Sequence, residues 1–320
     1  MLLMMSLDIM ALFRALPASV AQGMLWGIMA IGVYITFKVL DFADLTVDGS
    51  LALGGAVAVM LIRGGIPPVL AICIATLCGL LAGFITGILN TVLGIPDILA
   101  GILTQLALYS INLNVMGKSN QAVSVDKYGL IVSLRHISHT MLVGIAFIIV
   151  LVAVLYWFFG TERGFTIRAT GCNQNMARAQ GINTNVAKVL ALALSNALVG
   201  LSGALIAQYQ GSADVNMGRG AIVIGLAAVI IGEVIGDAVF GKHMNFALRM
   251  LFAAVGAIIY YIVITFVLWL GLPSDDMKLF SAIVVAIFLA VPYLKGKYNT
   301  SFAKAAKNSK RCCGQKGDAK

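Results

Sequence analysis

The sequence predicts an all-α polytopic membrane protein of about nine transmembrane helices, within a range of eight to ten. Hydrophobic residues make up 60% of the 320 residues and charged residues only 11%, and the mean hydropathy is +0.98. A soluble domain carries about a quarter charged residues, because water must wet its surface. Apolar stretches long enough to cross the hydrocarbon core of a bilayer also recur along the whole chain.

A membrane-spanning helix needs about 20 mostly apolar residues. Nine stretches meet this requirement, at 17–37, 47–62, 67–89, 96–115, 141–159, 187–209, 220–241, 246–270 and 279–294. Pro67, Pro96 and Pro273 lie at span boundaries, where the missing N–H costs least. No linker separates soluble modules, so we expect residues 1–294 to form one transmembrane domain.

Small residues recur at four-residue spacing within two of the predicted spans. They are Gly79, Gly83 and Gly87 in one span and Gly200 and Ala204 in another. Small side chains let two helices approach closely in lipid. We therefore interpret these positions as packing surfaces first and as part of a pathway second.

The C-terminal residues 295–320 contain eight Lys or Arg and one Asp, and so supply +7 of the net charge of +9. Such a tail can bind nucleic acid, but next to a span the positive-inside rule explains it more simply. We expect a basic, disordered cytoplasmic tail and no nucleic-acid partner. The same rule puts residues 160–186 on the cytoplasmic side and residues 116–140 and 210–219 outside.

The polar stretch 161–183 is the longest predicted cytoplasmic loop. Thr170 or Asn173 can cap a short helix there, and Gly181 can end it. A short helix held between two spans is a suitable docking element for a soluble partner. An ordinary basic loop explains the same residues, and the residues alone leave both interpretations open.

Four segments resemble bacterial ABC permeases of the branched-chain amino acid and ribose family. They are residues 168–183, 192–205, 44–55 and 225–232, and together they cover most of 40–240 in the order found in that family. Residues 207–218 and 230–233 look most like the subgroup linked to tryptophan- or tyrosine-type uptake. Glu233 departs from the better-known branches, which usually carry a second glycine there, and this weakens the transfer of solute assignments from the branched-chain and ribose members.

The resemblance implies a permease subunit of the bacterial plasma membrane that works as a dimer of two copies. Two cytoplasmic ABC ATPases would dock on the loop, and an extracytoplasmic binding protein would deliver a small solute. An amino acid, aromatic or branched-chain, is the expected solute, and a sugar or nucleoside is the alternative. The residues that match the family's ATPase-coupling loop are Gly164, Arg168, Ala169, Gly171, Asn173, Asn175, Ala177, Ala179 and Gly181.

No phosphate-binding motif of the form Gly-x-x-x-x-Gly-Lys-Ser/Thr occurs in the sequence. ATP and Mg are therefore expected in the partner ATPase, and no cofactor is expected in this chain. The sequence also contains no nucleophile elbow and no His-Glu-x-x-His motif. We expect neither catalytic residues nor a metal site.

Polar side chains within apolar spans are the candidates for a translocation pathway, because burying them in lipid is costly. Asp44 with Asp48, and Glu233 with Asp237, each fall on one face of a helix if those stretches are helical. A proton-coupled secondary carrier would use such pairs, whereas capping of helices or pairing with nearby Lys and Arg explains them structurally. The pathway candidates are Asp44, Asp48, Ser50, Asn90, Gln105, Asn196 and Gln208.

Overall fold

The computed structural model describes residues 9–124, 128–241 and 244–269, with single residues between 279 and 290. This part of the chain holds ten α-helices, one π-helix and two short strands. Their bounds are α1 Ile9–Tyr34, η1 Ile35–Val39, α2 Thr46–Arg63, α3 Pro68–Thr91, α4 Asp97–Met116, β1 Asn120–Ala122, α5 Ile137–Phe159, α6 Glu162–Cys172, α7 Gln174–Ala179, α8 Thr184–Gln210, β2 Ser212–Asp214, α9 Ala221–Phe240 and α10 Phe246–Trp269.

Eight helices within the described ranges are long and apolar enough to cross a membrane: α1 with η1, α2, α3, α4, α5, α8, α9 and α10. The prediction of an all-α polytopic membrane protein is confirmed. The ninth predicted span at 279–294 lies almost entirely outside the described residues. Pro273 and the basic tail at 295–320 also lie outside them, so the predicted division into a membrane domain and a tail stays a prediction.

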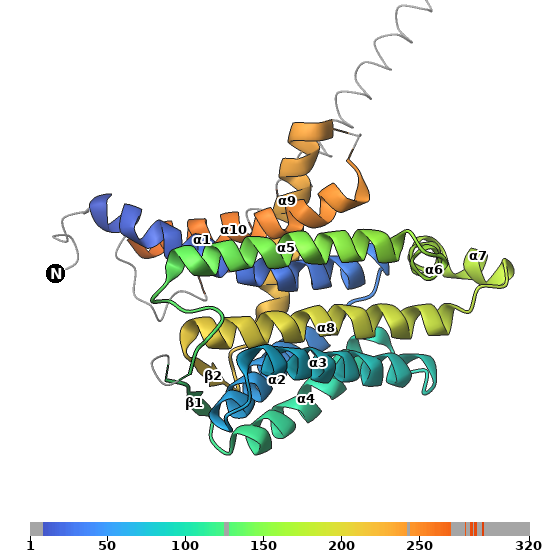
Figure 1. Cartoon of the computed structure of the whole chain (residues 1–320). Helices are drawn as coiled ribbons and strands as arrows, with labels where there is room; N and C mark the ends of the chain where they lie inside the picture. The colour runs from blue at the N-terminus through green and yellow to red at the C-terminus, as the bar shows by residue number, and fades with distance from the viewer. Residues whose placement is uncertain are drawn as a thin grey trace, which may run out of the picture.

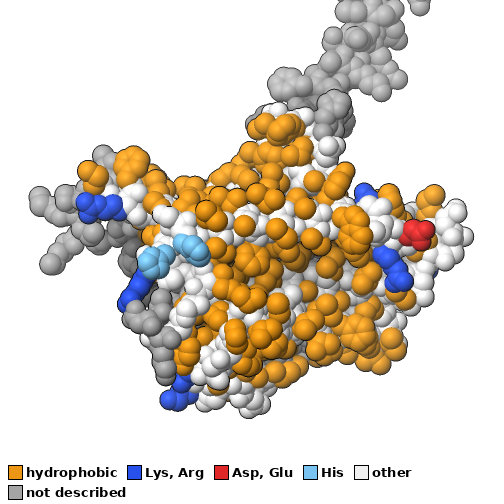
Figure 2. Space-filling view, in the orientation of Figure 1, with side chains coloured by type: hydrophobic (Ala, Val, Ile, Leu, Met, Phe, Trp, Pro, Cys, Tyr) orange, Lys and Arg blue, Asp and Glu red, His pale blue; other side chains and the backbone are white. Residues whose placement is uncertain are grey.

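The bundle has two distinct polar ends. The short helices α6 and α7 lie at one end, and β1 pairs antiparallel with β2 at the other (Figure 1). Hydrophobic side chains cover the middle of the face shown in Figure 2, while charged and histidine side chains gather at its ends. Helices α6 and α7, from the stretch predicted to be cytoplasmic, therefore lie at one end, and β1 and β2, from the stretches predicted to be external, lie at the other. Residues 215–219, also predicted to be external, instead fold back against α2, where Gly218 contacts the backbone of Asp48.

Proline and asparagine mark several helix starts. Pro67 and Pro96 directly precede the first residues of α3 and α4, as the sequence predicted. The Asn183 side chain accepts hydrogen bonds from the backbone of Asn185 and Val186 and so caps α8. The first helix is longer than the predicted span at 17–37, because it begins at Ile9 and carries Pro17 within it.

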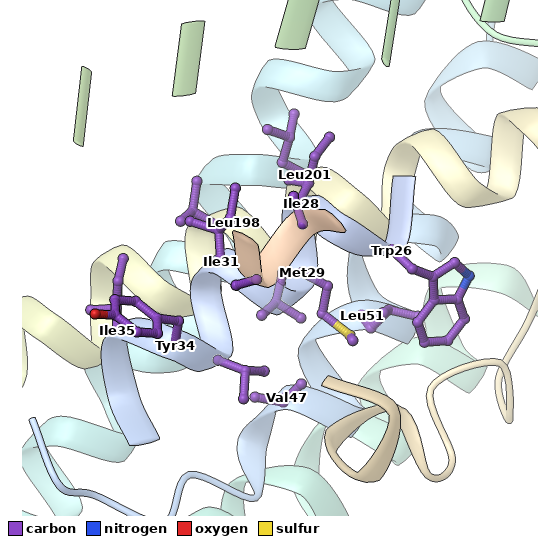
Figure 3. Packing of buried hydrophobic residues seen from close by; sticks show 14 of the residues in the cluster. Trp26, Ile28, Met29, Ile31, Tyr34, Ile35, Val47, Leu51, Leu198 and Leu201 are labelled. Atoms are coloured by element: carbon purple, nitrogen blue, oxygen red, sulfur yellow. The ribbon is translucent and has the colours of Figure 1, made fainter. Parts of the chain in front are cut away.

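Helix α8 is the centre of the bundle and packs against α1, α2 and α3. Figure 3 shows side chains of α1 facing Leu198 and Leu201 of α8 and Val47 and Leu51 of α2. All four of these side chains are buried. The core is thus built between the first helix and a helix that begins 175 residues later, since α1 starts at Ile9 and α8 at Thr184.

Glycines set the distance between α8 and its neighbours. A methyl group added at Gly79 would overlap the backbone carbonyl of Asn196, and one added at Gly83 would overlap that of Leu192. Gly54 of α2 approaches the backbone of Gly200 in the same way. The interpretation of the four-residue spacing as a packing surface is confirmed, because close backbone approach in lipid requires small residues.

The Gly83 contact leads to a direct test of this packing. We expect Gly83→Ala to lower the thermal stability of the purified protein in detergent, since overpacking a close interface costs about 1–3 kcal/mol. The matched control is Gly129→Ala, because no atom lies within 4 Å of a Cβ added there. Equal melting temperatures for the two variants would contradict the packing argument.

Candidate functional site

The predicted coupling loop folds as two short helices rather than one. Helix α6 runs to Cys172, and Asn173 then adopts an extended conformation and caps α7 by accepting a hydrogen bond from Met176 N at 3.0 Å. Gly181 has a φ of +80° just after α7, a conformation that favours glycine. Asn173 and Gly181 therefore mark the start and end of α7 as predicted, whereas Thr170 lies inside α6.

Five of the nine predicted loop residues are packed against the rest of this structure. The Arg168 guanidinium donates a 2.6 Å hydrogen bond to the Phe159 carbonyl. A side chain at Gly171 would overlap the Val39 carbonyl, so α6 contacts η1 directly. The packed members of the set are Gly164, Arg168, Ala169, Gly171 and Ala177, and the exposed members are Asn173, Asn175, Ala179 and Gly181.

Two apolar side chains of the same loop point into solvent. Phe165 is 58% exposed and Met176 is 62% exposed. Neither side chain was predicted as a site residue from the sequence, because neither belongs to the family pattern of the loop. An apolar side chain exposed at a polar end of the molecule is typical of a contact with another protein.

A buried carboxylate connects the first and second spans to α8. Asp44 is 2% exposed and accepts hydrogen bonds from Thr46 N at 2.9 Å and Asn196 Nδ2 at 2.7 Å. The Oδ1 atom of Asn196 accepts from Ser50 Oγ at 2.7 Å. The structure thus brings together three of the predicted pathway residues, Asp44, Ser50 and Asn196.

Threonine hydroxyls extend this network sideways. The Oγ1 atoms of Thr46 and Thr86 are hydrogen-bonded at 2.8 Å, and Thr86 Oγ1 donates to Thr104 Oγ1 at 3.0 Å. These hydrogen bonds join α2, α3 and α4. Asp44 itself lies in the connection between η1 and α2, where complete burial raises the pKa of its carboxyl and the hydrogen bonds from Thr46 and Asn196 oppose that shift. Every member of the network has a protein partner, as buried polar groups require.

Asp48 has a different environment from Asp44. The prediction that the two carboxylates share one helical face holds only if their stretch is helical, but α2 begins at Thr46, so Asp44 lies before the helix and that condition is not met. The Asp48 carboxylate accepts hydrogen bonds from Gly220 N at 3.0 Å and Ile222 N at 2.9 Å. It therefore caps the N-terminus of α9, where a negative charge is favoured by the helix dipole.

The remaining pathway candidates are spread along the bundle. Asn90 donates to the Ile95 carbonyl and to Asp97, so it fastens the turn between α3 and α4. Gln208 accepts from Ile131 N near the β1–β2 end. Gln105 lines a cavity beside α2 together with Asp48.

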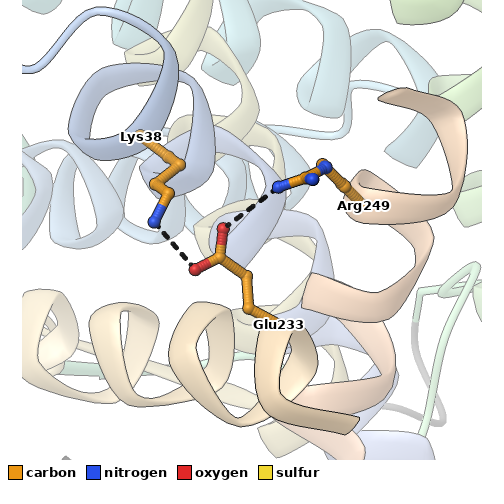
Figure 4. Close-up of polar contacts among 3 residues, drawn as sticks. All are labelled: Lys38, Glu233 and Arg249. Atoms are coloured by element: carbon orange, nitrogen blue, oxygen red, sulfur yellow. Dashed lines mark hydrogen bonds and ion pairs between the residues drawn. The ribbon is translucent and has the colours of Figure 1, made fainter. Parts of the chain in front are cut away.

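Glu233 forms an ion-pair cluster at the meeting point of η1, α9 and α10 (Figure 4). Its Oε2 atom lies 2.9 Å from Lys38 Nζ, and its Oε1 atom lies 3.9 Å from Arg249. Asp237, one turn later, is exposed. The structural interpretation of Glu233, pairing with nearby cations, is therefore the one that the geometry supports.

No group of three or more His, Cys, Asp or Glu side chains in the described ranges is arranged to hold a metal ion. A spanning bundle, buried polar contacts between helices and a pair of short helices at one polar end are consistent with a transport subunit of the membrane.

The family model described as branched-chain amino acid transport system, permease component, matches residues 16–292. The chain belongs to this permease family of ABC-type transporters, and it is a multi-pass protein of the bacterial plasma membrane. Members of the family are transport components and not themselves enzymes. The resemblance identified in the sequence is thereby confirmed.

Individual relatives support the same assignment. A tyrosine transport system permease protein of Clostridioides difficile is 39% identical over 287 residues, which are 88% of this chain and 92% of that protein. The autoinducer 2 import system permease protein LsrC of Escherichia coli is 30% identical over 197 residues, 60% of this chain and 56% of LsrC. No solved structure matches the chain.

The Asp44 network generates a prediction about stability. Asp44→Ala should lower the melting temperature in detergent strongly, because Thr46 N and one of the two N–H groups of Asn196 Nδ2 lose their acceptor, at about 1–3 kcal/mol each. The Asn196 amide keeps its hydrogen bond to the Leu192 carbonyl at 3.0 Å. Asp44→Asn keeps one acceptor oxygen and should therefore lower the melting temperature less than Asp44→Ala does.

The matched control is Asp41→Asn, because Asp41 is exposed in the same connection. Its melting temperature should equal that of the unmodified protein. An Asp44→Ala protein as stable as the Asp41→Asn control would rule out the proposed role of the buried network.

Proposed function

We propose that this chain is the permease subunit of an ATP-driven importer whose solute is an amino acid, with an aromatic amino acid favoured. The family assignment gives the transporter class. The relative with 39% identity over most of both chains is named for tyrosine transport, which supports an amino acid solute. A sugar or nucleoside is the second candidate, favoured by the resemblance to ribose-type permeases.

The proposed importer contains two copies of this chain, two ABC ATPases and an extracytoplasmic binding protein. A two-fold complex follows from closed symmetry, the default for a chain that carries a full set of spans. ATP and Mg would bind in the ATPases. The binding protein would dock at the end that carries β1 and β2, opposite the ATPases.

The α6–α7 pair is the observation that carries this proposal. The two helices present Phe165 and Met176 together with the exposed Asn175 and Ala179. Apolar residues surrounded by small and polar ones form the centre and rim typical of a protein contact. An ATPase that binds this surface would press on a structure held rigid by the Arg168 hydrogen bond.

Contacts between α6 and the membrane-spanning part of the bundle could transmit a movement of the docking surface. Helix α6 contacts η1 where Gly171 meets Val39. The connection that follows η1 carries Asp44, which is bonded to Asn196 in the middle of α8. We infer that displacement of α6 by ATP binding shifts this connection against α8, and so changes which side of the membrane the pathway faces.

The proton-coupled secondary carrier is less well supported. Both carboxylates near the second span are engaged by protein donors, and Glu233 is engaged by Lys38 and Arg249. A proton relay would need carboxylates that exchange protons with water along a path. The ATP-driven alternative needs no such relay.

The docking proposal is tested by purifying the tagged chain in detergent from its own bacterium and identifying co-purifying ABC ATPases by mass spectrometry. We expect an ATPase with the unmodified chain and a loss of at least tenfold with Met176→Asp, because a buried charge in an interface centre costs about 2 kcal/mol or more.

The control is Leu134→Asp, since Leu134 is 54% exposed outside the α6–α7 loop, in the 116–140 connection that we predict to be external. This control should retain the ATPase. Equal recovery of the ATPase with both variants would show that α6 and α7 are not the docking surface. Absence of any ATPase from the folded, unmodified chain would contradict the proposed function itself.

A further inference from the structure

A cavity of about 320 Å³ lies between α2, α4 and the segment that joins β2 to α9. Its walls combine opposite charges, amides and an aromatic ring. The lining residues that carry the argument are Asp48, Gln105, Tyr109, Asn112 and Arg219. Only two of these, Asp48 and Gln105, were pathway candidates from the sequence.

The cavity lies within the depth of the membrane-spanning helices. Tyr109 is seven residues before the end of α4 at Met116, which is about 10 Å at a rise of 1.5 Å per residue. Gly218 of the joining segment packs against the backbone of Asp48, the third residue of α2. The segment 215–219 therefore folds back into the bundle after β2, instead of forming a loop outside it.

Arg219 is the unusual residue of this cavity. Its guanidinium lies 6.0 Å from the centre of the Tyr109 ring, within range of a cation–π contact. Among the described residues, no carboxylate lies within ion-pair distance of Arg219. A cation at this depth is costly in lipid, so it is expected to face a water-filled path or a ligand.

The facing wall supplies acceptors. Asp48 uses its carboxylate oxygens to cap α9, but a carboxylate has about four lone-pair positions and so can accept further hydrogen bonds. Asn112 is 1% exposed, and its Oδ1 atom has no hydrogen-bond partner in the described structure. A buried acceptor without a protein partner at the edge of a cavity is available to a donor group of a ligand.

We propose that this cavity binds the zwitterionic backbone of an α-amino acid during transport. The ligand carboxylate pairs with Arg219, and the ammonium group donates to Asp48 and to Asn112 Oδ1. The ligand side chain lies along Tyr109 and Leu106 of α4. This inference rests on the proposed function and narrows it, because a neutral sugar would gain nothing from two opposite charges.

The exposure of the cavity on α4 also indicates what covers it. Leu106 is 64% exposed and Tyr109 43% exposed in the single chain, and Arg219 is exposed beside them. A guanidinium at this depth is costly in lipid. In the proposed dimer, the second copy of the chain would cover this face, and the two cavities would lie along the central passage.

The test uses the full-length protein in lipid nanodiscs with radiolabelled L-tyrosine as the probe. We expect saturable binding at millimolar concentrations or below, weakened at least tenfold by Arg219→Gln and partly restored by Arg219→Lys. Tyramine, which lacks the carboxylate, should compete poorly with tyrosine for the unmodified protein. In Arg219→Gln, tyramine should compete about as well as tyrosine does. A purely structural role of Arg219 would not produce this change in relative competition.

The control variant is Lys118→Gln, an exposed cation two residues after the end of α4 at Met116, which should bind like the unmodified protein. Absence of saturable tyrosine binding, or equal binding by Arg219→Gln, would overturn the inference. Uptake driven by ATP in the complete complex is measured separately. Tyrosine uptake that persists in Arg219→Gln would contradict only the proposed binding site. Absence of any ATP-driven uptake would contradict the proposed function.

Discussion

The direct contact of α2 and α3 with the backbone of α8 is the constraint on which the rest of the structure depends. Gly54, Gly79 and Gly83 allow these helices to touch α8 without intervening side chains. Helices in lipid gain little from the hydrophobic effect, so close packing and hydrogen bonds must hold them together. The short distance also brings Asp44 and Ser50 within reach of Asn196. Packing and polar recognition are thus consequences of the same glycines.

The charged groups within the bundle fall into two classes, those with hydrogen-bond or ion-pair partners in the described chain and those without. Asp44 is enclosed by donors and joins helices, and Glu233 is enclosed by Lys38 and Arg249. Arg219 has no such enclosure in the described chain. Membrane proteins retain unpaired charge at depth chiefly where solute or water passes. The contrast separates residues that hold the bundle together from those that line a path.

Much of the fold could be predicted because hydropathy and small-residue spacing are local signals. Apolar length located eight spanning helices, prolines marked two helix starts, and Asn173 marked the cap of α7. The site was less predictable because it depends on tertiary contacts. Residues 215–219 lie between two predicted spans, so the sequence places them outside. Only the packing of Gly218 on Asp48 brings Arg219 into the bundle. Likewise, nothing local shows that Asp48 caps a helix 170 residues later.

In the proposed mechanism, η1, the Asp44 connection and α8 couple the cytoplasmic docking surface to the polar cavity. The measurement that tests it most directly is uptake of L-tyrosine into proteoliposomes that hold the complete complex, with and without ATP on the side of α6 and α7. The account predicts accumulation that requires ATP, the ATPases and the binding protein. Accumulation by the isolated chain, driven by a pH gradient and indifferent to ATP, would contradict it.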